Sequence, residues 1–250
     1  MLLRPYNPAQ DVCIFDRCSC VDYGDLSTVP GYLSESHEMI TKGATQVLQS
    51  SATPIFLGGD HSISLPLLRA TTKKYGPVAL VHFDSHSDLW YSYYGGKDTH
   101  GTPFRRALEE NLIEPSRSSQ IGLRGSLYDR ADHQMSSAAG LHMVTGPELH
   151  AQGIAETIAQ VSDRVGDGPA YLSFDIDFVD PAYAPGTGTP EVGGFTGAQC
   201  QALIRGLTGI HFVAFDLVEV MPAYDLAGVT GLLAANLVYE FMSLIALGYS

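Results

Sequence analysis

Short apolar runs that end in polar or glycine-rich turns alternate along this chain with stretches of helical period. Residues 78–81, for example, read Val-Ala-Leu-Val and are followed closely by acidic residues. Strands that are apolar on both faces belong in the middle of a parallel sheet covered by helices. The pattern therefore predicts an α/β fold, a three-layer αβα sandwich with a mostly parallel central sheet.

The expected elements follow from hydrophobic period and turn signals. Strands are predicted at 11–21, 54–57, 78–83, 119–122, 141–144, 170–174 and 211–215. Helices are predicted at 34–50, 64–75, 103–111, 127–140, 146–165, 196–207 and 228–247. No internal repeat, low-complexity tract or linker separates them, so we expect residues 1–250 to form one domain.

Charge and cysteine content restrict the class of protein. The formal net charge is −13, and no lysine or arginine cluster reverses it locally, which argues against a nucleic-acid ligand. A cationic small molecule or a metal ion would be attracted instead. The acidity can equally serve solubility. The four cysteines match neither a disulfide framework nor a paired zinc motif, and no export leader opens the chain, which predicts a cytoplasmic location. The apolar segment 232–247 is interrupted by Asn236 and Glu240 and is expected to fall short of a membrane span.

Unusual polar residues follow four of the predicted strands. In open α/β sheets, ligands gather at the carboxyl ends of strands, so these side chains would share one crevice if the four strands are neighbours. The residues are His61 after the first of these strands, Asp84, His86 and Asp88 after the second, Asp175 and Asp177 after the third, and Glu219 after the fourth.

The carboxylates and imidazoles of this set suggest a metal centre. Alternate side chains of an extended segment share a face, so Asp84, His86 and Asp88 can converge, as can Asp175 and Asp177. Without a cation the carboxylates would repel one another. Six ligands are too many for one tetrahedral zinc but suit two ions about 3.5 Å apart, and a set rich in oxygen without sulfur favours manganese.

Each piece of this set has a simpler interpretation when it is taken alone. An Asp-x-Asp after a strand commonly caps the next helix, and residues 58–60 could form only a tight turn. His61 alone would more often be a hydrogen-bonded structural histidine. The metal hypothesis depends on three strand ends that supply compatible ligands together.

Three motifs resemble the ureohydrolases, the manganese enzymes that include arginase and agmatinase. They are GGDHS at 58–62, DSHSD at 84–88 and SFDIDFVDPAYAPGTGTPEVGG at 173–194, and related spacing runs from Pro5 to the C-terminus. The resemblance implies an arginase- or deacetylase-like sandwich that binds two Mn²⁺ ions. It implies two ligand sets bridged by Asp84 and Asp175: His61, Asp84, Asp88 and Asp175 for one ion, and Asp84, His86, Asp175 and Asp177 for the other.

The chemistry expected of such a site is hydrolysis of a guanidino compound to urea and an amine. Two cations lower the pKa of a shared water and present hydroxide to the guanidinium carbon. Glu219 could fix the guanidinium plane by paired hydrogen bonds, which is the role that the resemblance gives this position. The resemblance implies that His100 shuttles protons. It also suggests a trimeric or hexameric homo-oligomer.

The sequence leaves open which guanidino compound is the substrate. HGTPFRRA and YAPGTGTPEVGG look more like agmatinases and guanidino-acid hydrolases than like arginases. Tyr93 and Tyr94 could line the pocket entrance or pack at a subunit contact. The acidic surface favours a dication such as agmatine, whereas Lys97 or Arg124 could meet a carboxylate such as that of guanidinobutyrate.

One departure from the family concerns the N-terminus. Family members usually carry several tens of further residues there, so the first family strand is expected to be absent and the neighbouring strand edges unpaired. An alternative function is therefore a catalytically silent relative that binds metal or assembles with full-length subunits. Deacetylases share the general fold, but their single zinc with a different ligand set fits less well.

Overall fold

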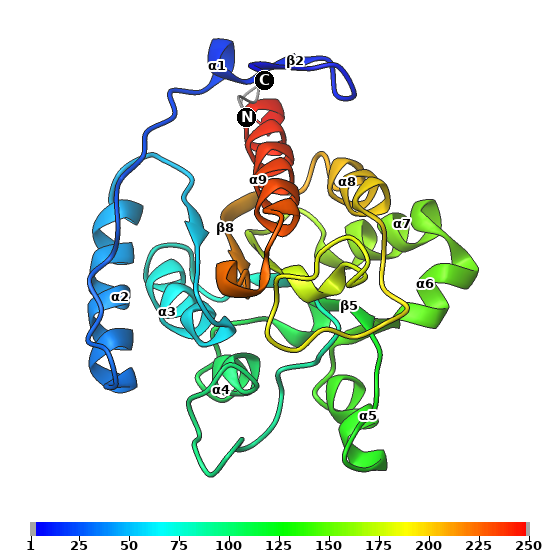
Figure 1. Ribbon diagram of the computed structural model, residues 1–250. Coiled ribbons are helices and arrows are strands. Elements are labelled where there is room, and N and C mark those ends of the chain that lie inside the picture. The colour runs from blue at the N-terminus through cyan, green and yellow to red at the C-terminus, as the bar shows by residue number, and fades with distance from the viewer. Residues whose placement is uncertain (1–3, 249–250) are drawn as a thin grey trace.

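The computed structural model describes residues 4–248 and has a six-stranded parallel sheet at its centre (Figure 1). The strand order is β3-β8-β7-β4-β5-β6, and every neighbouring pair is parallel. The strands are β3 (Ile55–Leu57), β4 (Ala79–Phe83), β5 (Ser119–Leu123), β6 (His142–Thr145), β7 (Ala170–Asp175) and β8 (Phe212–Val218). The α/β fold class with a mostly parallel central sheet is confirmed.

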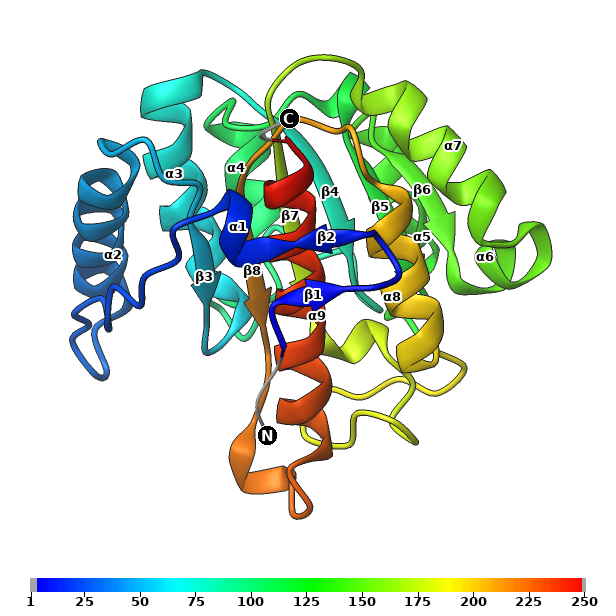
Figure 2. The same cartoon turned by 90° about the horizontal axis from the view of Figure 1, so that it is seen from above.

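Helices cover both faces of this sheet and make the three layers (Figure 2). One face packs on α2 (Leu33–Leu48), α3 (Ser64–Tyr75), α4 (Pro103–Glu109) and α5 (Arg130–Ala138). The other face packs on α6 (Gly146–Gln152), α7 (Ile154–Val165), α8 (Gly197–Gly206) and α9 (Val229–Gly248). Parallel strands that are apolar on both faces need this double cover, because neither face can remain in water.

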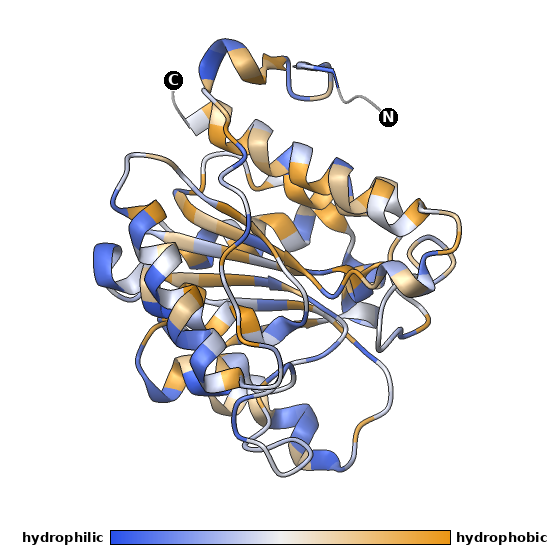
Figure 3. Cartoon of the chain, turned by 60° about the vertical axis from the view of Figure 1, so that its left-hand side comes forward, coloured by the Kyte–Doolittle hydropathy of each residue, from blue (hydrophilic) through white to orange (hydrophobic). Residues whose placement is uncertain are grey.

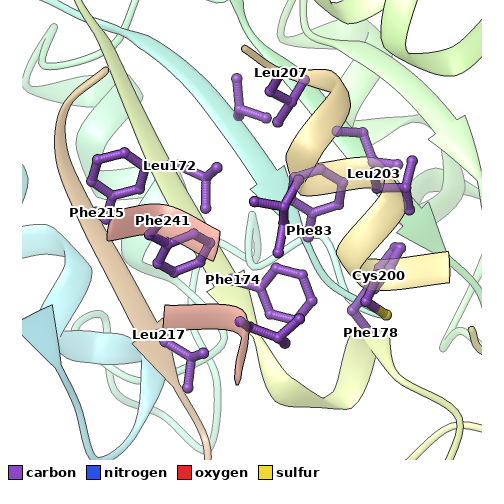
Figure 4. Close-up of a cluster of buried hydrophobic side chains, with 14 of the residues drawn as sticks. Phe83, Leu172, Phe174, Phe178, Cys200, Leu203, Leu207, Phe215, Leu217 and Phe241 are labelled. Atoms are coloured by element: carbon purple, nitrogen blue, oxygen red, sulfur yellow. The ribbon is translucent and has the colours of Figure 1, made fainter. Parts of the chain in front are cut away.

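Aromatic side chains fill the space between the sheet and the second helical layer (Figure 4). Phe174 on β7 and Phe215 on β8 are fully buried, and the Phe215 ring stacks on Phe241 of α9 at 5.1 Å between centroids. The colouring by hydropathy shows apolar strands inside the molecule and polar outer faces on several helices (Figure 3). The closed packing holds β7 and β8 rigidly at the centre of the sheet.

The prediction of a strand at 11–21 is wrong. This region contains only a two-residue strand, β2 (Val12–Cys13), which pairs antiparallel with β1 (Tyr6–Asn7), then the short helix α1 (Ile14–Arg17) and an irregular segment. Most of residues 15–32 are exposed, so apolar character here does not mark the sheet. The hairpin instead lies against α9, where the side-chain amide of Asn7 donates to Glu240 and Ser243, both at 2.9 Å.

The long helix predicted at 146–165 is two helices. Gly153 separates α6 from α7 with a φ of 84°, a conformation that favours glycine and ends the first helix. The remaining predicted helices are present with ends shifted by a few residues, and α3 agrees at both ends. At the sheet edge, β3 pairs with β8 alone within residues 4–248, and Leu57 on it is 70 % exposed.

Helix α9 corrects the expectation about membrane spans. It has 20 residues and is long and apolar enough to cross a membrane by length and composition alone. In this fold 44 % of its most apolar stretch is buried. Glu240, in the middle of the helix, is 1 % exposed and forms an ion pair with Arg205 of α8. A helix that packs on a sheet and carries a buried ion pair is typical of a protein core.

Candidate active site

The four strand ends singled out in the sequence meet at one edge of the sheet. β3, β8, β7 and β4 are consecutive in the strand order, so their carboxyl ends are neighbours. His61 lies in the 3-10 helix η1 (His61–Ile63) after β3, and Asp177 in η3 (Ile176–Phe178) after β7. Asp84 follows β4, and Glu219 follows β8. The structure therefore brings all six predicted ligands and Glu219 to one place.

His61 is the centre of the first group of side chains. Its Nδ1 atom lies 3.2 Å from Asp84 Oδ2, 3.0 Å from Asp88 Oδ2 and 3.2 Å from Asp175 Oδ2. All four residues are buried. Three carboxylate oxygens thus converge on one imidazole nitrogen, and the four side chains are those of the first predicted ligand set.

His86 is the centre of the second group. Its Nδ1 atom lies 3.0 Å from Asp177 Oδ2 and 3.5 Å from Asp84 Oδ1. Asp177 is held by Ser85, whose backbone N–H and hydroxyl both donate to Oδ1, at 3.0 and 2.7 Å. The carboxylate of Asp84 therefore turns one oxygen toward each group.

These side chains converge by turns, not by the strand alternation expected from the sequence. β4 ends at Phe83, and the backbone N–H of His86 donates to Asp84 Oδ1 at 2.6 Å. In the same way the N–H of Asp177 donates to Asp175 Oδ1 at 2.8 Å, where the strand gives way to η3. Asp84 and Asp175 therefore each begin an Asx turn, in which the carboxylate accepts the backbone N–H two residues later. The turn fixes the orientation of this carboxylate and bends the chain.

The charges of the site call for a cation. Burial, then Asp177 and Asp84, raise the pKa of Asp175 well above its usual value. Burial opposes protonation of His86, yet Asp177 and Asp84 raise its pKa to about 12. For His61 burial again opposes protonation, while Asp175, Asp84 and Asp88 raise its pKa well above the ordinary value. In the absence of a cation, protons must offset the carboxylate charge.

The buried Nδ1 atom of His61 supports a metal at this position. It has no hydrogen-bond partner of acceptable geometry among residues 4–248, although three carboxylates surround it. A buried ring nitrogen without a hydrogen-bond partner, beside several carboxylate oxygens, belongs to a donor set that fits a divalent cation. Two sets of three side chains place their ligand atoms within 4.8 Å of one another: His61, His82 and Asp84, and Asp84, His86 and Asp177.

His82, inside β4, contacts the site directly. Its Nε2 atom lies 2.8 Å from Asp84 Oδ2, and its Nδ1 atom accepts from the amide of Gln120 at 2.9 Å. The same amide nitrogen donates to the carbonyl of Ser87 at 2.6 Å, which fixes it as a donor. Nε2 of His82 therefore carries the hydrogen and donates to Asp84, so His82 orients a carboxylate and is not itself available as a ligand.

A small pocket opens above these groups. Six of the residues that line it were predicted from the sequence as site residues: His61, His86, Asp88, Asp175, Glu219 and His100. Trp90, Tyr93 and Thr189 complete it. Trp90 stacks on Tyr93 at 4.7 Å between centroids, and Tyr93 meets the His100 ring edge-on at 5.2 Å. His100 is thus in the site, on an aromatic wall that the sequence indicated only in part.

Glu219 is anchored in this pocket by the backbone. Its Oε1 atom accepts the N–H of His61 at 2.7 Å. Burial raises the pKa of Glu219 to about 7, although the hydrogen bond and charge of His61 lower it. Glu219 and Asp88 both have positive φ angles, 63° and 53°. Such a conformation costs a residue other than glycine roughly 1 to 3 kcal/mol and is concentrated at functional sites.

The two cations considered for a substrate carboxylate are engaged elsewhere. Arg124 donates to the backbone carbonyls of Asp177 at 2.7 Å and of Glu191 at 2.8 Å, with longer contacts to three further carbonyls. Its guanidinium therefore fastens the loop after η3. Lys97 lies over the Tyr91 ring at 5.1 Å. Of the two tyrosines, Tyr93 lines the pocket and Tyr94 is 87 % exposed.

The sequence and the fold of this chain are similar to those of known hydrolases. A family model described as the arginase family matches residues 1–244. The chain is 44 % identical to guanidinobutyrase of Pseudomonas aeruginosa over 98 % of this chain and 77 % of that protein. It is 42 % identical to the mitochondrial agmatinase of Gallus gallus over 98 % and 72 % of the two chains. The solved structure of proclavaminate amidino hydrolase from Streptomyces clavuligerus superimposes with a TM-score of 0.93 at 36 % identity, over 98 % of this chain and 82 % of that one.

Proposed function

The chain belongs to the arginase family, and on that premise we propose that it hydrolyses a guanidino compound to urea and an amine with two Mn²⁺ ions. The observation that carries this proposal is the carboxylate of Asp84, which turns Oδ2 toward His61 and Oδ1 toward His86. A shared carboxylate between two donor groups supports two neighbouring ions. The relatives named guanidinobutyrase and agmatinase support the substrate class.

We propose the ligand sets expected from the sequence. His61, Asp84, Asp88 and Asp175 would hold one ion, and Asp84, His86, Asp175 and Asp177 the other. When bound, the ions supply a water of lowered pKa and screen the carboxylates from one another. Oxygen-rich sites with few nitrogens and no sulfur favour manganese over zinc.

Glu219 is proposed to orient the substrate. Its Oε1 atom is held by the N–H of His61, but each carboxylate oxygen can accept two hydrogen bonds. Both oxygens can therefore accept from two guanidinium nitrogens and hold the guanidinium plane above the metal site. The central carbon of a guanidinium held in this way would face the side chains of His61 and His86.

His100 is proposed to carry protons at the pocket wall. It lies beside Tyr93 in the lining of the pocket. An imidazole can deliver a proton to the departing nitrogen near neutral pH and recover it from water. The Trp90 and Tyr93 rings exclude water from the apolar part of the substrate.

The test is urea release by the manganese-loaded protein with agmatine, 4-guanidinobutyrate, 3-guanidinopropionate and arginine as substrates. We expect turnover of at least one of the first three and a much lower kcat/KM for arginine. No urea from any of them, with Mn²⁺ bound, would favour the catalytically silent relative. We also propose that residues 1–250 act as one domain, in the cytoplasm, as a trimer or hexamer.

A further inference from the structure

We propose that Asp216, acting through Ser173, is a positioning residue that fixes which nitrogen of His61 faces the metal. This inference rests on the proposed metal site. Asp216 lies in β8, and its hydrogen-bond partners among residues 4–248 include none of the predicted ligands, so its effect must pass through Ser173.

Asp216 is a fully buried acid that faces three hydroxyl groups. Ser173 donates to its Oδ1 atom at 2.6 Å, while Ser64 and Tyr171 donate to Oδ2, both at 2.6 Å. All four residues are 0 % exposed. Ser173 and Asp216 are partners in the register of β7 and β8, so the sheet itself sets their contact. Burial and the charge of Asp216 raise the pKa of Tyr171 well above its ordinary value, which keeps that hydroxyl a donor.

The direction of each hydrogen bond follows from counting hydrogens. A carboxylate only accepts, and a serine hydroxyl has one hydrogen to give. Ser173 gives its hydrogen to Asp216, so its oxygen must accept from His61 Nε2, which lies 2.8 Å away. His61 therefore carries its hydrogen on Nε2. In the neutral ring that a metal ligand requires, the lone pair is then on Nδ1, the atom that lies closest to the oxygens of Asp84, Asp88 and Asp175.

The opposite direction would be costly. If Ser173 donated to His61, Asp216 would lose one of its three donors in a place that water does not reach. Buried polar groups left unpaired cost far more than exposed ones, and more so when charged. The neutral ring would then carry its hydrogen on Nδ1, where a metal needs a lone pair. Partners of this kind typically change metal affinity about 10- to 100-fold.

The test uses Asp216→Asn and Ser173→Ala, with Ser64→Ala as the matched control. Asparagine has nearly the same shape, but its amide can donate to Ser173, which frees the serine hydroxyl to donate to His61. Ser173→Ala removes the intermediate group altogether. Ser64→Ala removes another buried hydroxyl that donates to Asp216 and leaves the hydrogen bonds from Asp216 through Ser173 to His61 in place.

Binding of Mn²⁺ alone is measured by competition with a fluorescent chelator, beside thermal unfolding of each variant. We expect one of the two Mn²⁺ ions to bind about 10- to 100-fold more weakly in Asp216→Asn and in Ser173→Ala. The other ion should stay within about threefold, because His86 lies outside this network. Ser64→Ala should keep both affinities, and at saturating Mn²⁺ the substrate KM of Ser173→Ala should equal that of the wild type.

Unchanged affinities in both variants, or an equal loss at both ions, would overturn the inference. If Asp216→Asn does not fold, Ser173→Ala decides the matter alone, since it deletes a single atom. A wild-type protein that binds no Mn²⁺ would instead refute the proposed function. The two failures are therefore distinguishable in one experiment.

Discussion

Asp84 is the residue on which the site depends most. It is fully buried, and its two oxygens face different histidines. Burial alone would raise its pKa, but His82, His61 and His86 hold the pKa well below the ordinary value. Asp84 is thus a carboxylate whose charge is secured on three sides, which suits a ligand shared between two cations.

At the same scale, Glu219→Gln separates substrate binding from metal binding. Glutamine keeps a carbonyl oxygen for the N–H of His61 but loses the negative charge that would hold the guanidinium. We expect kcat/KM for the best substrate to fall about 10²- to 10³-fold, the loss typical of one charge-stabilising group. The Mn²⁺ content should stay the same. Wild-type kcat/KM in this variant would remove Glu219 from the mechanism.

At the residue scale, the sequence predicted which side chains lie near one another at strand ends. The polar side chains at the carboxyl ends of β3, β4, β7 and β8 could be identified as neighbours from the sequence, because strand ends meet at one edge of a parallel sheet. Gln120, Ser173 and Asp216 were missed, because they touch the site only through the pairing of particular strands. For His82 a signal existed, since it stands two positions before Asp84.

At the scale of elements, hydrophobic period predicted the six central strands and failed at the N-terminus. The central strands are buried on both faces, so their apolar runs are continuous. Residues 11–21 have similar apolar content, but they belong to a hairpin and an exposed segment fixed by contacts with α9. Such contacts between distant parts of the chain leave no local pattern. The break at Gly153 had a signal in the glycine itself.

A buried histidine on helix α2 makes a prediction about how the stability of the fold depends on pH. His37 on this helix is 3 % exposed, and burial, then the charge of Arg69, lower its pKa, against the opposing charges of Asp98, Asp60 and Glu110. A histidine whose native pKa is lowered contributes stability above its unfolded pKa. That contribution is lost as the pH falls below 6.5 toward the native value.

We therefore compare urea unfolding of the wild type and His37→Gln, without metal, at about pH 8 and about pH 5. The glutamine variant cannot pick up this proton. The difference in unfolding free energy between the two proteins should shift in favour of the variant at the lower pH. A difference that is the same at both pH values would show that folding does not lower the pKa of His37.

The whole molecule is acidic, with a formal net charge of −13, and it concentrates buried acids at one sheet edge. A fold of this kind gains stability from cations that bind the native state only. One site with free metal at 100 times its Kd adds about 2.7 kcal/mol, which for a chain of this size raises the Tm by roughly 5 to 10 °C.

Metal removal should therefore lower the thermal stability clearly. We expect the Tm to fall by at least this amount when Mn²⁺ is replaced by a chelator, as followed by circular dichroism. Asp177→Asn, which weakens the second proposed ligand set, should show a smaller difference between the two conditions. An equal Tm with and without metal would mean that the acids are accommodated by protons alone.

The most direct measurement is the number of manganese atoms retained per chain after Mn²⁺ loading and gel filtration, determined by elemental analysis. The shared position of Asp84 between His61 and His86 predicts two atoms in the wild type. A content of one atom or none, in protein that is folded, would contradict the dinuclear site and the hydrolysis proposed from it.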